Sequence, residues 1–183
     1  MPKKKGVRVT IIVEDEALER FSREVLIEFG FSRHELRVEK CPAGKGSAKD
    51  WVNKRYPVEV QIMRSKAHQN LGVVVGTDVD ELSVIQRAGR LAEALQNADV
   101  EARRGNEQIV FWMPKWNIET WILYFSGDVR DEDGNYKDSV RNPDYPNAAR
   151  AFFEEYRNYK VSTEIETQPS LRSAYEETKR LNV

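Results

Sequence analysis

The stretch Val9-Thr-Ile-Ile-Val13, followed at once by Glu14-Asp-Glu16, decides the fold class of this chain. Its unbroken run of β-branched and apolar residues predicts a strand that is buried on both faces. A second run of this kind, Leu71-Gly-Val-Val-Val75, leads into Asp78-Val-Asp-Glu81. Both predicted strands therefore end in acidic residues. Carboxylates at two strand ends can converge above one edge of a sheet, where they would suit a hard divalent cation such as Mg2+.

The rest of the chain alternates between strand and helix patterns. Leu18, Phe21, Val25 and Phe29 fall at helical spacing, and Gly30 is a fitting stop. Short strands are expected at 37–41 and 108–113, and helices at 83–96, 117–125, 148–159 and 170–181. Another helix is expected to start after Ser47 and to end before Pro57. The alternating residues 58–62 fit a strand or a helix, and residues 126–147 form a long polar loop.

Strands that alternate with helices imply crossover connections. The chain is therefore predicted to be α/β, with a mainly parallel Rossmann-like sheet, helices on both faces and a C-terminal helical extension. Its 183 residues fit a single core. Residues 7–125 would form the α/β domain, and residues 126–183 would be a loop plus a helical extension packed on that domain. In such sheets, sites form beyond the carboxyl ends of the strands.

Composition excludes several classes of protein. Cys41 is the only cysteine, so the sequence has neither an intrachain disulfide nor a thiolate metal cluster. No apolar run approaches the ~20 residues of a membrane span. Residues 1–6 lack the apolar segment of a secretory signal. We therefore expect a cytoplasmic protein without a membrane partner.

The net charge of −1 gives no global reason to bind nucleic acid, but residues 40–70 are locally basic. The candidate phosphate-binding residues in this stretch are Lys45, Lys49, Lys54 and Arg55. Gly44-Lys-Gly-Ser47 lacks the full phosphate-loop pattern, although glycines before a helix can expose N–H groups to an anion. A flexible loop before a solvated helix would explain the same residues.

These motifs together carry a family resemblance. A strand running into Glu, followed by a strand running into Asp-x-Asp, resembles the TOPRIM (topoisomerase–primase) fold of primases, topoisomerases and overcoming-lysogenization-defect nucleases. Residues 114–125, Pro-Lys-Trp-Asn-Ile-Glu-Thr-Trp-Ile-Leu-Tyr-Phe, are similar to the Asn-x-x-(Phe/Ile)-Glu-x-Trp-Leu-Leu segment of small RloB-like phage-defence proteins. The resemblance covers residues 7–125. One departure is Asp15, where the family has Gly, and it leaves open whether Glu14 or Glu16 is the functional acid. Strand register favours Glu14.

The resemblance implies a nuclease or nucleic-acid processing protein that depends on Mg2+ or Mn2+ and acts in phage defence with an ATPase partner. Asp78 and Asp80 would be metal ligands. Glu14 would be a ligand or a general base, and Glu119 would complete the site or position a water. The substrate would be DNA rather than RNA. The helices after Pro143 could form a homodimer or partner surface, although ordinary packing explains them equally well.

Other interpretations remain open. Residues 11–16 followed by an amphipathic helix also resemble the start of a response-regulator receiver domain, in which Asp78 or Asp80 would accept a phosphoryl group. A degenerate TOPRIM scaffold is a third option. Asp15 and Glu16 could simply start a helix, and Glu119 could only stabilise a helix dipole. The tryptophans flanking Glu119 could stack bases, but large aromatics of this kind usually lie in the core.

Overall fold

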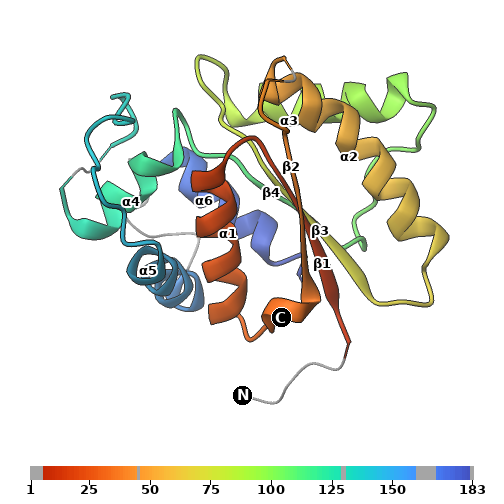
Figure 1. Cartoon of the computed structure of the whole chain (residues 1–183), viewed down its shortest axis with the longest axis horizontal. Helices are drawn as coiled ribbons and strands as arrows, with labels where there is room; N and C mark the ends of the chain where they lie inside the picture. The colour runs from red at the N-terminus through yellow and green to blue at the C-terminus, as the bar shows by residue number, and fades with distance from the viewer. Residues whose placement is uncertain (1–5, 45, 129–130, 160–167, 182–183) are drawn as a thin grey trace.

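The computed structural model describes residues 6–44, 46–128, 131–159 and 168–181 (Figure 1). Its centre is an all-parallel sheet of four strands in the order β2-β1-β3-β4. The strands are β1 (Arg8–Val13), β2 (Leu36–Lys40), β3 (Leu71–Gly76) and β4 (Ile109–Trp112). The helices are α1 (Glu16–Glu28), α2 (Ala48–Ser65), α3 (Val84–Asn97), α4 (Ile118–Ser126), α5 (Tyr145–Asn158) and α6 (Pro169–Thr178), with a 3-10 turn, η1 (Arg33–Glu35), before β2. The predicted Rossmann-like α/β class is confirmed.

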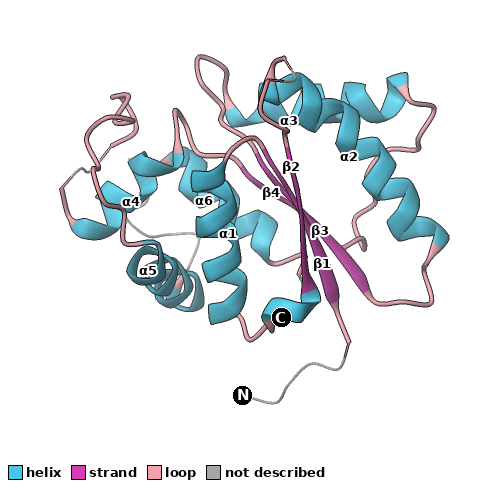
Figure 2. Ribbon diagram, viewed as in Figure 1, coloured by secondary structure: helices cyan, strands magenta, loops and turns pink. Residues whose placement is uncertain are grey.

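Alternate side chains along the strands pack into two separate hydrophobic cores, one on each face of the sheet. Val9 and Ile11 face a core that includes α1, α4, α5 and α6, whereas Ile12 faces a core that includes α2 and α3. Successive residues of a strand point to opposite faces, so unbroken apolar strands require cover on both sides. Figure 2 shows the helices lying on both sides of the sheet. Among the described residues, no helix has both the length and the apolar character needed to cross a membrane.

The C-terminal helices pack directly on the α/β core. α5 lies against α1 and α4, and α6 lies against β4. Thr178 accepts a hydrogen bond from the Trp112 indole at 2.9 Å, and Phe111 N–H donates to Glu177 at 3.2 Å. The side of β4 that has no neighbouring strand is therefore covered by α6.

The expected end of a helix before Pro57 is wrong, because α2 continues through Pro57 to Ser65. Proline lacks the N–H that a helix interior uses. However, Val52, Tyr56, Val60 and Met63 form one buried stripe on both sides of this position. Burial of that stripe against the sheet and α3 outweighs the missing hydrogen bond. The ambiguous residues 58–62 are helical for the same reason.

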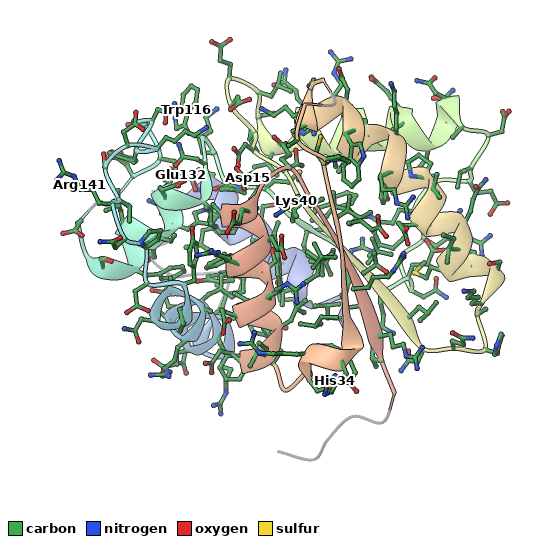
Figure 3. The ribbon with its side chains drawn as sticks, in the orientation of Figure 1. Asp15, His34, Lys40, Trp116, Glu132 and Arg141 are labelled. Carbon is green, nitrogen blue, oxygen red and sulfur yellow. The ribbon has the colours of Figure 1, made fainter. Side chains whose placement is uncertain are left out.

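The strand order places a topological switch point at one end of the sheet. From β1 the chain passes to β2 on one side, and β3 lies on the other side of β1. α1 and α3, which follow β1 and β3, cover opposite faces, so the loops leaving these two strands diverge. Open parallel sheets bind ligands at such a switch point, outside the carboxyl ends of the strands. Figure 3 shows Asp15, Lys40, Trp116 and Glu132 at this end and His34 at the opposite end.

Candidate metal centre

Glu14 and Asp78 come together at the switch point. Val13, the last residue of β1, pairs in register with Gly76, the last residue of β3. A Cβ at Gly76 would lie 2.9 Å from a methyl group of Val13, so glycine permits this close approach of the two strand ends. Glu14 directly follows β1, and its Oε1 accepts a hydrogen bond from the backbone N–H of Asp78 at 3.2 Å.

Thr77 and Arg87 fix the orientation of the Glu14 carboxylate. Arg87, which is 3% exposed on α3, donates to Thr77 Oγ1 from Nε at 3.1 Å and from Nη2 at 2.6 Å. The single hydroxyl proton of Thr77 is therefore directed to Glu14 Oε1, with which Thr77 forms a short hydrogen bond. Oε1 thus accepts from both Thr77 and Asp78, which leaves Oε2 of Glu14 for another partner.

Asp78 is the most perturbed acid of the site. Burial, together with the negative charges of Glu14 and Asp15, raises the pKa of the Asp78 carboxyl from 3.8 to about 8. Its Oδ1 is buried, and the described residues offer it no hydrogen-bond partner. Burial also raises the pKa of Glu14, although Thr77, Lys49 and Arg87 oppose that change. Two partly buried carboxyl groups with raised pKa values lie side by side, and one oxygen of Asp78 is unsatisfied.

Asp80 does not continue the strand alternation that the sequence analysis used to place it beside Asp78. β3 ends at Gly76, and Asp80 sits in a turn with a φ of 55°. Val79 between the two acids is 1% exposed, and its N–H donates to Pro114 O at 2.9 Å. The Asp80 carboxylate forms an ion pair with Lys49 from α2. Strand geometry therefore no longer supports the prediction that Asp80 is a metal ligand.

Asp15 and Glu16 belong to the start of α1. Asp15 is the N-cap, and its carboxylate accepts from Leu18 N–H at 2.9 Å. Glu16 is exposed and pairs with Arg20 one turn along the helix, at 2.5 Å. Of the two candidates for the functional acid, Glu14 is therefore the one that lies beside Asp78, and Glu16 lies on the surface.

Glu119 lies in the first turn of α4, and, in addition to burial, its charge contributes to the raised pKa of Asp78. Burial, with a further contribution from Asp15, raises the pKa of the Glu119 carboxyl. Glu119 and Asp15 in turn contribute to a raised pKa of the Tyr145 phenol, after burial as the main cause. These mutual effects place Glu119, Asp15 and Tyr145 within electrostatic range of one another, next to the strand ends.

The predicted basic residues do not form one surface. Lys49 faces the acidic cluster, where its ammonium group opposes the raised pKa values of Glu14 and Asp78. Lys54 is exposed on α2, and Arg55 forms ion pairs with Glu39 at 3.1 Å and with Glu59 at 2.6 Å. Lys45 lies outside the described residues. Of the three that the structure describes, Lys49 is the one that adjoins the acidic cluster.

The aromatic residues near Glu119 are mainly structural. Trp112 and Trp121 are fully buried, as expected for core residues. Trp116 is half-buried, and its indole donates to the backbone O of Glu132 at 3.1 Å. The carboxylate of Glu132 accepts from Ser170 N–H at 3.0 Å and from Leu171 N–H at 3.4 Å, so it holds the start of α6. Residues 126–147 were expected to form a long polar loop, and this role of Glu132 was not predicted.

Thr77 and Arg87 were also missed. Nothing in the local sequence distinguishes Arg87 from the other cations of a helix. One feature could have indicated its role. Arg87 lies on the same side of α3 as the buried residues Leu91 and Leu95, and an arginine in such a position needs a buried partner. Among the described residues, no group of three or more Asp, Glu, His or Cys side chains is arranged to hold a metal ion. Of the predicted metal ligands, Glu14 and Asp78 are the two that a hydrogen bond joins, from the Asp78 N–H to Glu14 Oε1.

No protein-family model, curated protein or solved structure matched this chain. The resemblance to TOPRIM proteins therefore stays a prediction that rests on the three short motifs.

Proposed function

We propose that this protein is a phosphodiesterase that depends on Mg2+ or Mn2+ and cleaves nucleic acid, as the TOPRIM resemblance implies. The observation that carries the proposal is the state of Asp78. Its buried Oδ1 lacks a partner among the described residues, and its carboxyl group has a pKa of about 8 beside the second acid, Glu14. A divalent cation would satisfy the free oxygen and compensate both negative charges.

The residues present fit Mg2+ better than Ca2+. Mg2+ keeps several of its waters and is usually held by one or two carboxylates together with substrate phosphates, whereas Ca2+ takes six to eight oxygen ligands. Asp78 and the Oε2 atom of Glu14 would supply the two carboxylates. Asp80 would join them only after release from Lys49. When bound, the cation would supply Lewis-acid polarisation of a phosphodiester and a water of lowered pKa.

The remaining residues have roles that follow from their positions. Glu119, with its raised pKa, would exchange a proton with the attacking water or the leaving oxygen. Lys49 is the nearest cation on α2 and would meet a backbone phosphate. Arg87 is buried behind Thr77 and would orient Glu14 rather than touch the substrate. An ATPase partner and a role in phage defence remain predictions of the resemblance alone, and a homodimer remains a prediction based on the helices after Pro143.

The test of this function is metal-dependent cleavage of DNA and RNA substrates, single-stranded and double-stranded. We expect the wild type to cleave with Mg2+ or Mn2+, DNA in preference to RNA, and Asp78→Asn to lose at least 100-fold in rate. Glu16→Gln is the matched control, because Glu16 belongs to the same acidic run but lies on the surface. Equal rates for wild type and Asp78→Asn would refute the proposal.

A receiver-like phosphoacceptor is the second candidate, because the order β2-β1-β3-β4 is also that of flavodoxin-like and receiver domains. Asp78 would then be the acceptor. Because Oδ1 is buried, the other carboxylate oxygen, Oδ2, would have to accept the phosphoryl group. Labelling of Asp78 by acetyl phosphate, without metal-dependent cleavage, would favour the receiver. Absence of both activities would favour a scaffold.

A further inference from the structure

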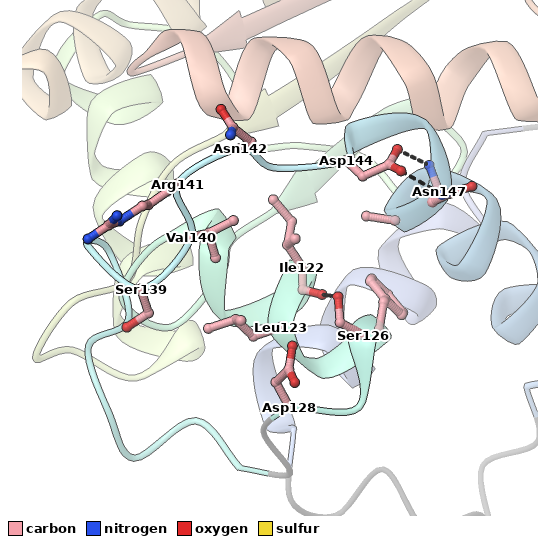
Figure 4. Close-up of a pocket in the computed structure, with 12 residues that line it drawn as sticks. Ile122, Leu123, Ser126, Asp128, Ser139, Val140, Arg141, Asn142, Asp144 and Asn147 are labelled. Carbon is pink, nitrogen blue, oxygen red and sulfur yellow. Dashed lines mark hydrogen bonds between the residues drawn. The ribbon is translucent and has the colours of Figure 1, made fainter.

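A cavity of about 510 Å3 lies between α4, the loop 139–142 and the start of α5 (Figure 4). Ligand pockets for small molecules usually measure about 300–1,000 Å3, so one nucleoside fits this volume. The cavity is separate from Glu14 and Asp78, and none of the predicted site residues lines it.

The walls of the cavity combine apolar surface with free polar groups. Ile122, Leu123 and Val140 supply the apolar part. The carboxylate of Asp128 and the side-chain amide of Asn142 form no hydrogen bond with the described residues.

Two other polar side chains of the wall are already engaged. Ser126 Oγ donates to Ile122 O at 2.9 Å, and Asp144 accepts from the side-chain amide of Asn147 at 2.6 Å. Arg141 extends outward at the rim (Figures 3 and 4). Asp128, Arg141 and Asn142 are all exposed, so a ligand would meet an acceptor, a cation and an amide at the opening of the cavity.

The cavity adjoins the acidic cluster through two elements. Ile122 and Leu123 follow Glu119 by three and four residues, so they lie one helical turn further along the same face of α4. Asp144, on the opposite wall, directly precedes Tyr145, which lies within electrostatic range of Glu119 and Asp15. One turn of helix advances about 5.4 Å, so this wall of the cavity begins about one turn along α4 from Glu119.

We propose that this cavity is a nucleoside-binding subsite for the nucleic-acid strand, and its place beside a scissile phosphate rests on the proposed function. The base would lie against Leu123 and Val140, as bases lie against apolar and aromatic surfaces in single-strand binders. Asp128 would accept hydrogen bonds from an exocyclic amino group or from sugar hydroxyls. Arg141 would meet the adjoining phosphate at the rim.

The experiment is calorimetric titration of 5′-mononucleotides into the full chain, with EDTA present so that binding does not depend on metal. We expect the wild type to bind at least one mononucleotide. Val140→Trp, which fills the cavity, should weaken binding at least tenfold, and Asp128→Asn should weaken it several-fold for nucleotides with an amino group on the base. The matched controls are Val58→Trp, at an exposed position of α2, and Asp133→Asn, an exposed acid of the same loop.

The outcomes separate this inference from the proposed function. Mn2+ binding without nucleotide binding by the wild type would overturn the subsite and leave the metal site standing. Nucleotide binding without Mn2+ binding would support the subsite as a nucleoside site and remove its link to a scissile phosphate. Unchanged nucleotide affinity in both Val140→Trp and Asp128→Asn would overturn the proposal, and Asp128→Asn provides that answer even if the tryptophan variant does not fold.

Discussion

The hydroxyl of Thr77 donates its proton to the carboxylate of Glu14, which joins the ends of two strands 63 positions apart in the chain. Arg87 determines the direction of this hydrogen bond. Its guanidinium group donates to Thr77 Oγ1, so the hydroxyl proton of Thr77 points to Glu14. The consequence is a carboxylate with Oε1 held in place and with Oε2 lacking a hydrogen bond from the described residues. A metal site built on Glu14 therefore depends on two residues that would not touch the metal.

Replacing Thr77 should weaken metal binding without removing a ligand. Thr77→Val deletes the donor to Glu14 and leaves the Arg87 guanidinium without its acceptor, whereas Thr77→Ser keeps the hydroxyl. Since residues that orient ligands are typically worth 10–100-fold in metal affinity, we expect a loss of that order for Thr77→Val and a small change for Thr77→Ser. Mn2+ titration measures both, and equal affinities of the folded valine and serine variants would contradict the orientation by Thr77.

The contribution of Asp78 to the stability of the metal-free protein should fall as pH rises from about 4 to about 8. The pKa of Asp78 is about 8 in the folded state and near 3.8 when the group is solvated, so within this interval the folded state holds a proton that the unfolded state has lost. Above pH 8 Asp78 no longer contributes to the slope of the unfolding free energy against pH. Urea unfolding of wild type and Asp78→Asn at several pH values measures it. The asparagine variant should show the flatter profile, and parallel profiles would contradict the raised pKa.

Lys49 should compete with a metal for Asp80. The two side chains form an ion pair, and both are partly exposed. If Asp80 is a ligand, Lys49→Met should strengthen Mn2+ binding by roughly 2–5-fold, in line with the ~1 kcal/mol ceiling for exposed ion pairs. That gain should shrink when the same substitution is made in an Asp80→Asn background. A gain of equal size in both backgrounds would remove Asp80 from the metal site and leave only the general charge effect of Lys49.

Glu132 should stabilise the protein without affecting metal binding. Its buried carboxylate accepts backbone N–H groups of Ser170 and Leu171 at the start of α6. Glu132→Ala leaves these donors unsatisfied, which should cost about 1–3 kcal/mol of unfolding free energy. Asp133→Asn, at an exposed neighbouring position, is the control and should change stability little. Denaturant unfolding measures both variants, and equal stabilities would show that Glu132 does not anchor the helix.

Local patterns predicted the frame of the molecule well. The strands that became β1 and β3 follow from runs of apolar residues, and the starts of α1 and α3 follow from Asp15 and Ser83, whose side chains cap the helices. The position of Glu14 at a strand end also follows from local sequence. These features depend on residues close in the chain, which a sequence displays directly.

Other features depend on contacts between distant segments and could not be predicted. Pro57 predicts the end of a helix, but α2 continues through it because a stripe of buried residues packs on the sheet and stabilises the helix. Asp80 reads as a second strand-end ligand, but the chain turns before it and Lys49 pairs with it. Arg87 reads as one surface cation among many. Its role appears only when α3 places it behind Thr77.

The central claim is that Glu14 and Asp78 hold a divalent cation, and calorimetric titration of Mn2+ into the metal-free protein at pH 8 tests it most directly. The account predicts one bound Mn2+ in the wild type and in Glu16→Gln, and at least a tenfold loss of affinity in Asp78→Asn and in Glu14→Gln. Each variant should still unfold cooperatively, which separates loss of binding from loss of fold. Absence of Mn2+ binding by the wild type, or equal affinity in Asp78→Asn and Glu16→Gln, would contradict it.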